Sequence, residues 1–168
     1  MRTISDAVLT VADLSELMTT VADAASSEAV FSAVAGAAET FIGHRLFTIM
    51  AFDAKAMQVQ RRYSSNPEAY PPGGTKAKRD TQWGRHVLEQ GRPFIGRNAD
   101  DIRTNFDDHE VIFGLGLGSV LNVPIRIWGR TIGTMNLLHQ TEFYSTVDLE
   151  RGFIFAGLLV GPLYSEMK

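Results

Sequence analysis

Apolar and polar residues alternate most regularly over residues 118–139, where the chain is expected to form a β-hairpin. On the first strand, one set of alternate positions is apolar from Leu121 to Ile127, whereas the other set includes Asn122. The second strand has Thr134 and Asn136 in one set. The two predicted strands are Ser119–Ile127 and Thr131–His139. Successive side chains point to opposite faces, so the turn between the strands decides which sets share a face.

This turn is predicted to contain three residues, Ile127, Trp128 and Gly129. A two-residue turn would require a positive φ at Trp128, which a bulky side chain resists. A three-residue turn requires a positive φ only at Gly129, where the missing side chain permits it. The choice predicts one apolar face and one face with two carboxamides and a hydroxyl. The predicted pairs are Leu121 with Met135, Val123 with Gly133, Asn122 with Thr134, and Val120 with Asn136.

The face with the carboxamides has two interpretations. Buried polar side chains usually find a hydrogen-bond partner nearby, so the Asn side chains could simply bond to loop backbone. Alternatively, this face is the floor of a ligand pocket, because such pockets combine apolar walls with a few polar groups. The candidate ligand-binding residues on the floor are Asn122, Thr134, Asn136, Val120 and Leu138, with Thr48 and Met50 from an earlier strand.

Elsewhere, the periodicity predicts helices at both ends of the chain and short elements between them. Residues 66–80 carry no apolar period and contain three prolines and two glycines, so a loop is expected there. Helices are predicted over residues 4–25, 27–42, 81–90, 109–115 and 146–163, and further strands over residues 46–52, 57–64 and 94–96. The expected N-terminal caps are Ser5 or Asp6, Ser26 or Ser27, Asp107 or Asp108, and Ser145, the last in a capping box with Asp148.

Helices that bracket an antiparallel sheet define an α+β fold. The length of 168 residues suits one domain over residues 1–168, with a core of residues 26–165. The helix over residues 4–25 then lies outside this core.

The first and last helices carry more apolar surface than one sheet can cover. Apolar residues recur at a/d spacing along the first helix, and the last helix is apolar on nearly all sides. We therefore predict a homodimer through these two helices. The predicted interface residues are Val11, Leu14, Met18, Val21, Phe153 and Val160.

The composition narrows the classes of function. The formal net charge of −3 argues against a partner such as nucleic acid or an anionic membrane. The chain has no cysteine, which excludes disulfides, thiolate metal sites and thiol nucleophiles. No apolar run is long enough for a leader or a membrane span, and a cytoplasmic protein is expected.

Positive charge is concentrated in residues 61–103, which hold nine of the sixteen cations and five acids. Such a tract can be an ordinary solvated surface. It can also attract an anionic metabolite to a pocket that this part of the chain covers. Under the second interpretation, Trp83, Arg85 and His109 are the side chains expected to close the pocket.

No set of residues points to catalysis or to a resident cofactor. Residues 107–110, Asp-Asp-His-Glu, lack the second histidine of a zinc motif and are better explained as capping acids. The glycines of residues 114–118 precede a strand rather than a helix, so the context of a dinucleotide loop is missing. The sequence has no Gly-x-Ser-x-Gly nucleophile motif. The chain is therefore expected to be neither an enzyme nor a metalloprotein.

Three segments together resemble the GAF domain. They are Val87–Ile95, the pattern Ser119–Ile125 with Ile132–Leu137 after a glycine turn, and Phe143–Asp148. The resemblance runs through residues 27–163 in the family's order. It implies a GAF-like, profilin-like central antiparallel sheet of five to six strands with helices on both faces, and the N- and C-terminal helices on one face. The other face, covered by the variable middle of the chain, would form a small-molecule pocket.

The resemblance implies a sensory or regulatory function. GAF domains bind cyclic nucleotides, tetrapyrroles, haem, amino acids or other small metabolites, and they often dimerise through their terminal helices. Without cysteine this chain cannot attach a bilin through a thioether, and the Asn-Lys-x-Phe-Asp-Glu run of cyclic-nucleotide-binding members is missing. We expect a dimeric signalling module that binds an unidentified small metabolite and acts on a separate output protein. The alternatives are a degenerate domain used only for dimerisation or protein contact, and a small enzyme with non-thiol chemistry.

Overall fold

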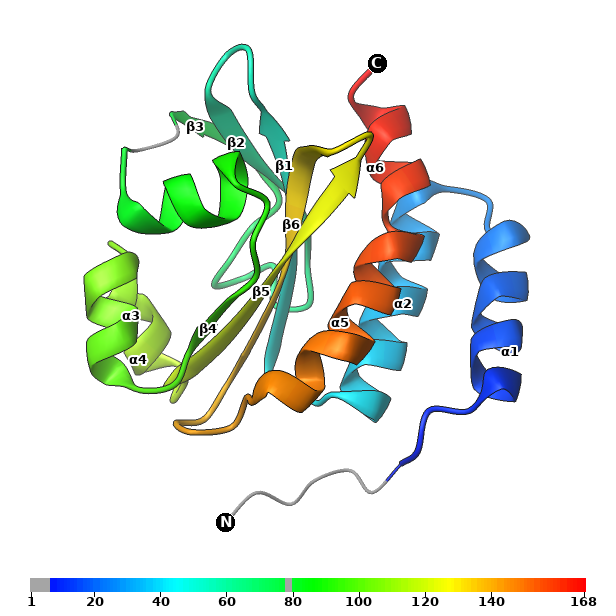
Figure 1. The fold of residues 1–168 in the computed structure, drawn as a ribbon, viewed down its shortest axis with the longest axis horizontal. Coiled ribbons are helices and arrows are strands. Elements are labelled where there is room, and N and C mark those ends of the chain that lie inside the picture. The colour runs from blue at the N-terminus through cyan, green and yellow to red at the C-terminus, as the bar shows by residue number, and fades with distance from the viewer. Residues whose placement is uncertain (1–6, 78–79) are drawn as a thin grey trace.

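The computed structural model of the chain describes residues 7–77 and 80–168. In this part of the chain, six strands form one sheet in the order β3-β2-β1-β6-β5-β4, and all neighbours are antiparallel (Figure 1). The predicted α+β class with five to six strands is confirmed. The strands are β1 (Leu46–Asp53), β2 (Gln58–Ser64), β3 (Gly73–Ala77), β4 (Phe94–Gly96), β5 (Ser119–Ile127) and β6 (Arg130–His139).

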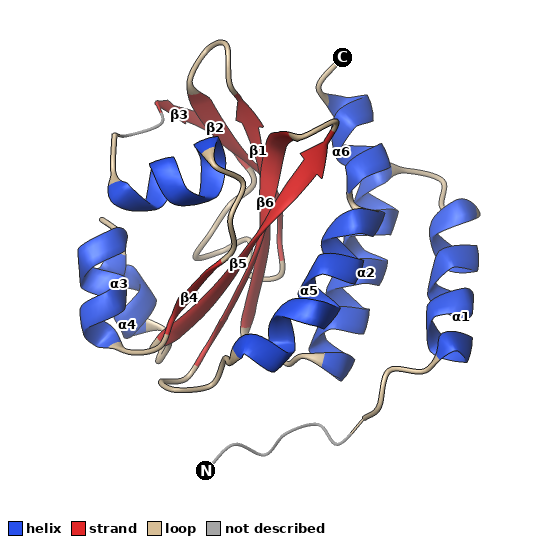
Figure 2. Ribbon diagram, in the orientation of Figure 1, coloured by secondary structure: helices blue, strands red, loops and turns tan. Residues whose placement is uncertain are grey.

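Helices cover both faces of the sheet, as predicted (Figure 2). The first and last helices lie on one side, with α1 outermost against α2, and the short helices of the middle segment lie on the other side. The helices are α1 (Val11–Ala22), α2 (Ser27–Phe41), the π-helix η1 (Gly84–Glu89), α3 (Ala99–Asn105), α4 (His109–Gly114), α5 (Thr146–Leu158) and α6 (Val160–Glu166). The break between α5 and α6 comes just before Pro162, which cannot continue a helix as a donor.

Helix α1 is shorter than predicted because its cap is a different residue. Thr10 caps it in a capping box, in which the Asp13 carboxylate accepts a 2.8 Å hydrogen bond from the Thr10 backbone N–H. The predicted caps Ser5 and Asp6 lie outside the described residues. The capping box of Ser145 and Asp148 is confirmed, since the Ser145 N–H donates to the Asp148 carboxylate at 2.8 Å.

The turn of the β5–β6 hairpin is not the predicted one. It contains two residues, Trp128 and Gly129, whose φ values of 48° and 76° are both left-handed. Two-residue hairpin turns favour positive φ at both positions because their twist matches that of the strands. The Trp128 ring also packs edge-on against the Tyr164 ring, with 5.8 Å between centroids. These gains outweigh the steric cost of a positive φ at Trp128.

The strand pairing also differs from the prediction, by two positions. A two-residue turn by itself would move Asn122 opposite Met135, on the wrong face. A register shift between Ile125 and Arg126 restores the alternation. Asn122, Thr134 and Asn136 therefore share a face, as predicted, although the turn and the pairs behind that prediction were wrong. The observed pairs include Leu121 with Leu137, Asn122 with Asn136, and Val123 with Met135.

The opposite, apolar face of the sheet forms the main core with α2, α5 and α6. Leu121, Val123 and Met135 are fully buried there. Gly133 lies where β6 passes close to β1 and α6: a Cβ atom at this position would overlap the Met50 carbonyl oxygen and lie 2.6 Å from Leu163 Cδ2. The layers can therefore meet only because residue 133 has no side chain.

Strand β3 was predicted as loop, and this prediction was wrong. Its five residues, Gly-Gly-Thr-Lys-Ala, are all exposed, so no apolar period marks them. The strand forms because it lies at the sheet edge and pairs through its backbone with β2. Gly73 and Gly74 have positive φ values of 88° and 65°, which lets the chain turn onto the edge after Pro71 and Pro72.

His44, between α2 and β1, should make stability depend on pH. Burial lowers the pKa of its ring, and the Ala35 carbonyl oxygen, 2.9 Å from Nε2, accepts a hydrogen bond from the neutral ring. The unfolded chain therefore takes up the second ring proton, which makes the imidazolium, more readily than the folded chain. The stabilisation by His44 is complete above about pH 6.5 and is lost as the pH falls. We expect the difference in unfolding free energy between wild type and His44→Gln, measured with urea, to shrink from pH 7.5 to 5. A difference independent of pH would contradict this.

Candidate functional site

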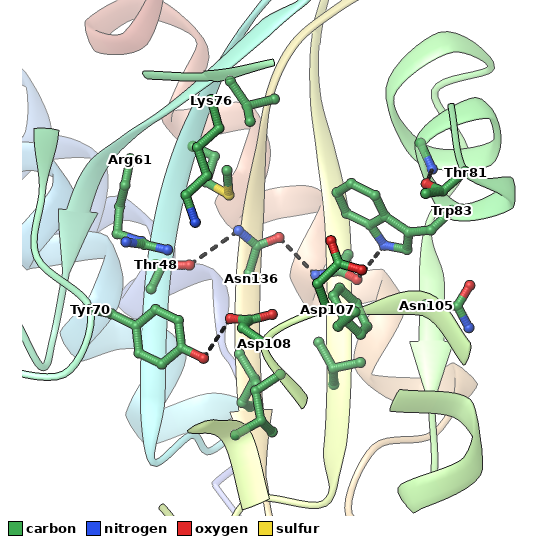
Figure 3. Close-up of a pocket in the computed structure, with 18 of the residues that line it drawn as sticks. Thr48, Arg61, Tyr70, Lys76, Thr81, Trp83, Asn105, Asp107, Asp108 and Asn136 are labelled. Atoms are coloured by element: carbon green, nitrogen blue, oxygen red, sulfur yellow. Dashed lines mark hydrogen bonds between the residues drawn. The ribbon is translucent and has the colours of Figure 1, made fainter. Parts of the chain in front are cut away.

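A cavity of ≈ 250 Å³ lies between the polar face of the sheet and the cover formed by η1, α3 and α4 (Figure 3). This volume is just below the range of about 300–1,000 Å³ for drug-sized ligand sites, so it suits a small metabolite. Its walls are mainly apolar. The sheet contributes Leu46, Met50, Val120 and Leu138, and the cover contributes Leu88, Phe106 and Ile112.

A chain of side-chain hydrogen bonds crosses the floor of this cavity. Trp83 Nε1 donates to Asn122 Oδ1 at 2.9 Å, Asn122 Nδ2 donates to Asn136 Oδ1 at 2.7 Å, and Asn136 Nδ2 donates to Thr48 Oγ1 at 3.1 Å. The indole N–H can only donate, so it fixes the orientation of both carboxamides. The Thr48 hydroxyl accepts the last hydrogen bond of this series, which leaves its own O–H available to donate to a ligand.

The register of three strands produces this chain. Asn136 on β6 lies directly opposite Asn122 on β5 and opposite Thr48 on β1. Side chains directly opposite one another on one face are close enough to bond. All three residues are buried. The floor is therefore preorganised by the sheet rather than by mobile loops.

A second polar group lines the wall nearest β2. The Tyr70 hydroxyl donates to Asp108 Oδ2 at 2.7 Å, and the Arg61 guanidinium lies over the Tyr70 ring, 4.8 Å from its centroid. Burial, and then the hydrogen bond to Asp108, raise the pKa of Tyr70, so the phenol stays protonated. Burial lowers the pKa of Arg61, although a guanidinium remains cationic at neutral pH.

The two acids before α4 were predicted to be capping residues, and for Asp108 this was wrong. Asp108 occupies the N-cap position, but its side chain makes no capping hydrogen bond. Its carboxylate instead accepts from Tyr70. Asp107 also lines the cavity.

Seven of the ten predicted ligand-binding residues line the cavity: Asn122, Asn136, Val120, Leu138, Thr48, Met50 and Trp83. Thr134, Arg85 and His109 do not. Thr134 is on the right face and buried but does not line the cavity, and its hydroxyl has no hydrogen-bond partner among the described residues. Arg85 is exposed and pairs with Asp80, while the His109 ring bonds to the Phe106 carbonyl at 2.9 Å. Arg85 and His109 lie in the short helices of the cover, where the sequence spacing was not enough to predict the direction of a side chain.

Sequence reasoning missed most of the ionisable lining. Arg61 lies two residues after Val59 on β2, so the two side chains share a face, and both line the cavity. Alternation would therefore have placed Arg61 in the lining once β2 was known to lie beside the pocket. Lys76 was hidden by the prediction of a loop, because only the pairing of β3 with β2 brings it to the cavity. Tyr70 lies in a segment without periodicity, and no sequence signal marked it.

Two further properties bear on the class of function. Within residues 7–77 and 80–168, no group of three or more His, Asp or Glu side chains is arranged to hold a metal ion. In the same residues, no helix is long and apolar enough to cross a membrane.

Comparison with known proteins identifies the fold through structure rather than sequence. A scan against models of protein families gives no match, and a search of curated proteins gives none. Solved structures do match. The GAF domain of a phosphoenolpyruvate-protein phosphotransferase from Acinetobacter has a TM-score of 0.73 and 14% identity, over 92% of each chain. The GAF domain of the corresponding Coxiella burnetii protein gives the same values.

A GAF domain from a two-component sensor histidine kinase of Bacillus halodurans also matches, with a TM-score of 0.64 and 14% identity, over 92% of this chain and 95% of that chain. The chain therefore has the GAF-domain fold. The fold expected from the sequence resemblance is confirmed, although identities this low say nothing about a shared ligand.

Proposed function

We propose that this chain is a sensory GAF domain that binds a small molecule in the cavity over β1, β5 and β6. The observation that carries the proposal is the open space above a prearranged polar floor. In a degenerate domain, apolar side chains would fill this space. Here they form walls around ≈ 250 Å³, while Trp83, Asn122 and Asn136 hold one another in a fixed arrangement.

Binding rather than catalysis is favoured by the state of the ionisable groups. The Tyr70 phenol has a raised pKa and donates a hydrogen bond to Asp108, so it stays protonated and is a poor nucleophile or base at neutral pH. The floor itself is made of carboxamides and a threonine, which hydrogen-bond but do not transfer protons. We therefore propose a regulatory role without turnover.

A variant with a filled cavity tests the proposal. Met50→Trp adds an indole from the centre of β1 into the cavity, whereas Ala54→Trp adds the same group in the exposed β1–β2 turn. Screening a metabolite library by thermal shift should identify compounds that raise the Tm of wild type and Ala54→Trp but not of Met50→Trp. Equal shifts for all three proteins would show binding elsewhere and contradict the proposal.

We further propose that the domain works as a homodimer through α1 and α5. Helix α1 buries none of its residues fully, and its apolar residues divide between two sides. Val21 packs on the core and Leu14 is partly buried, whereas Val11 and Met18 are 83% and 58% exposed. On the last two helices, Phe153 is half exposed and Val160 packs on the core. The exposed part of this surface would be covered by a second copy.

Met18→Glu should convert the dimer to monomer, because it buries a charge in an apolar contact. The matched control is Thr20→Glu, which adds the same charge at an exposed position facing away from Met18 on the helix. Light scattering at micromolar concentration should report a dimer for wild type and Thr20→Glu. A monomeric wild-type protein would end this part of the proposal and leave the pocket unaffected.

A further inference from the structure

Two connections of the chain meet at one wall of the cavity. The first, residues 66–72, lies between β2 and β3, brings Tyr70 to this wall and is named the strap. The second, residues 106–108, lies between α3 and α4 and brings Asp108. The Tyr70 hydroxyl donates to Asp108 Oδ2 at 2.7 Å, so a side-chain hydrogen bond joins the strap to the cover of the cavity (Figure 3).

The strap is a stiff unit that ends at two glycines. The Tyr70 backbone N–H donates to the Asn66 carbonyl oxygen at 2.9 Å, and the Ala69 N–H donates to Asn66 Oδ1 at 3.2 Å. Prolines at positions 67, 71 and 72 fix φ in the rest of the strap. Gly73 and Gly74 follow directly, and both have a positive φ and open space where a Cβ would be. The strap can therefore move as one piece about these glycines.

Arg61 and an apolar cluster hold the strap against the cavity. Arg61 Nη1 donates to the Pro71 carbonyl oxygen at 3.1 Å, and the guanidinium lies over the Tyr70 ring. The Tyr70 ring is 8% exposed and packs in an apolar cluster with Leu46 and Ile112. The closed arrangement is therefore the stable one, and an arrangement with the strap turned outward would be a minor state.

Asp108 has an alternative partner in the helix that it precedes. It occupies the N-cap position of α4, where an aspartate carboxylate commonly accepts from the second or third N–H group of the helix, here those of Glu110 and Val111. Its side chain makes no such bond, and its φ of −86° and ψ of 21° are not the extended values of a capping residue. The carboxylate therefore bonds to Tyr70 instead of capping α4, and release of Tyr70 would leave it able to cap.

We propose that the hydrogen bond between Tyr70 and Asp108 is a latch that controls access to the cavity. In the closed state it joins the strap to the connection between α3 and α4. In the open state the strap turns outward about Gly73 and Gly74, and Asp108 caps α4. Because the carboxylate has a hydrogen-bond partner in both states, the loss of Tyr70 on opening is partly offset. This inference rests on the proposed function, because it assigns the control of entry to the same cavity.

The alternative is a fixed bond that only stabilises the wall. The two cases differ in what Asp108 does after the Tyr70 hydroxyl is removed. If the bond is fixed, its loss loosens both the strap and the start of α4. If it is a latch, the strap loosens while the freed carboxylate stabilises the start of α4.

Hydrogen exchange in Tyr70→Phe, followed by NMR for each amide of the ligand-free protein, separates these cases. The variant keeps the buried ring and removes only the hydroxyl. Exchange at Ala69 and at position 70 should become at least about tenfold faster, the factor expected for the loss of a hydrogen bond to a charged group. Exchange at Glu110 and Val111 should become slower. Asp108→Ala should speed exchange at both places, because it removes the latch and the cap together. Faster exchange at both places in Tyr70→Phe, or no change in the strap, would overturn the latch.

Thiol labelling tests whether the strap controls access to the cavity itself. The chain has no cysteine, so Val120→Cys places a single thiol at a position that lines the cavity and is 1% exposed. When reclosing is faster than labelling, the rate of reaction with iodoacetamide follows the fraction of open molecules. Adding Tyr70→Phe to this variant should raise the rate at least about tenfold. The matched control is Tyr63→Phe, which removes a phenol hydroxyl on β2 beside the main core and should leave the rate unchanged. An unchanged rate in Tyr70→Phe, or an equal rise in both variants, would overturn the proposal.

These measurements need no ligand, so they separate the latch from the proposed function. If compounds bind in a way that Met50→Trp blocks, but Tyr70→Phe changes neither exchange nor labelling, the latch is wrong and the pocket remains. If exchange and labelling change as expected, but no compound binds in that way, the strap opens a cavity that takes no ligand and the proposed function is wrong.

Discussion

Gly133→Ala is expected to destabilise the domain by at least about 3 kcal/mol, and Gly133→Val to prevent folding altogether. A Cβ at this position would overlap the backbone oxygen of Met50, which cannot rotate away as a side chain could. Relief would require β1 to separate from β6 at the centre of the sheet, where these strands pair from Leu46 to Ala51. Urea unfolding followed by circular dichroism measures the effect.

Gly157→Ala is the matched control for this substitution. A Cβ at Gly157, on α5, would meet no atom within 4 Å. Alanine favours a helix over glycine by up to about 1 kcal/mol, so this variant should be as stable as wild type or more stable. If Gly133→Ala unfolds at the wild-type urea concentration, the close approach of β6 to β1 and α6 is wrong.

Asn136→Leu is expected to cost about 1–3 kcal/mol of stability even without a ligand. It removes the acceptor of Asn122 Nδ2 and the donor to Thr48, so a buried N–H loses its partner. Asn122→Leu should cost a similar amount, because it removes the acceptor of the Trp83 indole. Since the two residues bond to each other, the double variant should lose clearly less than the sum of the two single losses. Additive losses would show that the chain of hydrogen bonds is not a unit.

Thr134→Val provides the contrast on the same face of the sheet. The Thr134 hydroxyl is buried and has no partner in the part of the chain that the structure describes, so an equally sized methyl group should be neutral or should stabilise the protein. A polar residue that bonds within the floor and one that does not are thus expected to respond in opposite directions. A loss of several kcal/mol in Thr134→Val would mean that a partner of this hydroxyl exists.

The floor of the pocket could be predicted from sequence because a strand has a period of two. Alternation in residues 119–127 and 131–139 placed Asn122 and Asn136 together, and it did so even though the predicted turn was wrong. The shorter turn and the register shift each move the strand pairing by one residue, and each such move exchanges the two faces of a strand. Here the two moves cancelled, so the predicted face was kept. A prediction based on faces is therefore more robust than one based on particular pairs.

The positively charged tract was expected near the pocket, but which charged side chains reach the cavity could not be predicted, because this depends on contacts between distant segments. Lys76 reaches the cavity through an edge strand of glycine and polar residues, which forms by backbone pairing alone. Asp108 follows a pattern typical of helix caps, yet its carboxylate bonds to Tyr70, which lies thirty-eight residues earlier in the chain. Local sequence contains no information about either contact.

Whether this cavity holds a small molecule in the purified protein tests the central claim most directly. Native mass spectrometry of protein expressed in cells and purified without added ligand should give a species heavier than the chain, and denaturation should release the difference as one or a few small molecules. After incubation with a cell metabolite extract, wild type and Ala54→Trp should bind the same mass, and Met50→Trp should bind none. If all three proteins show only the mass of the chain, before and after incubation, the cavity is not a ligand site and the sensory function proposed here is wrong.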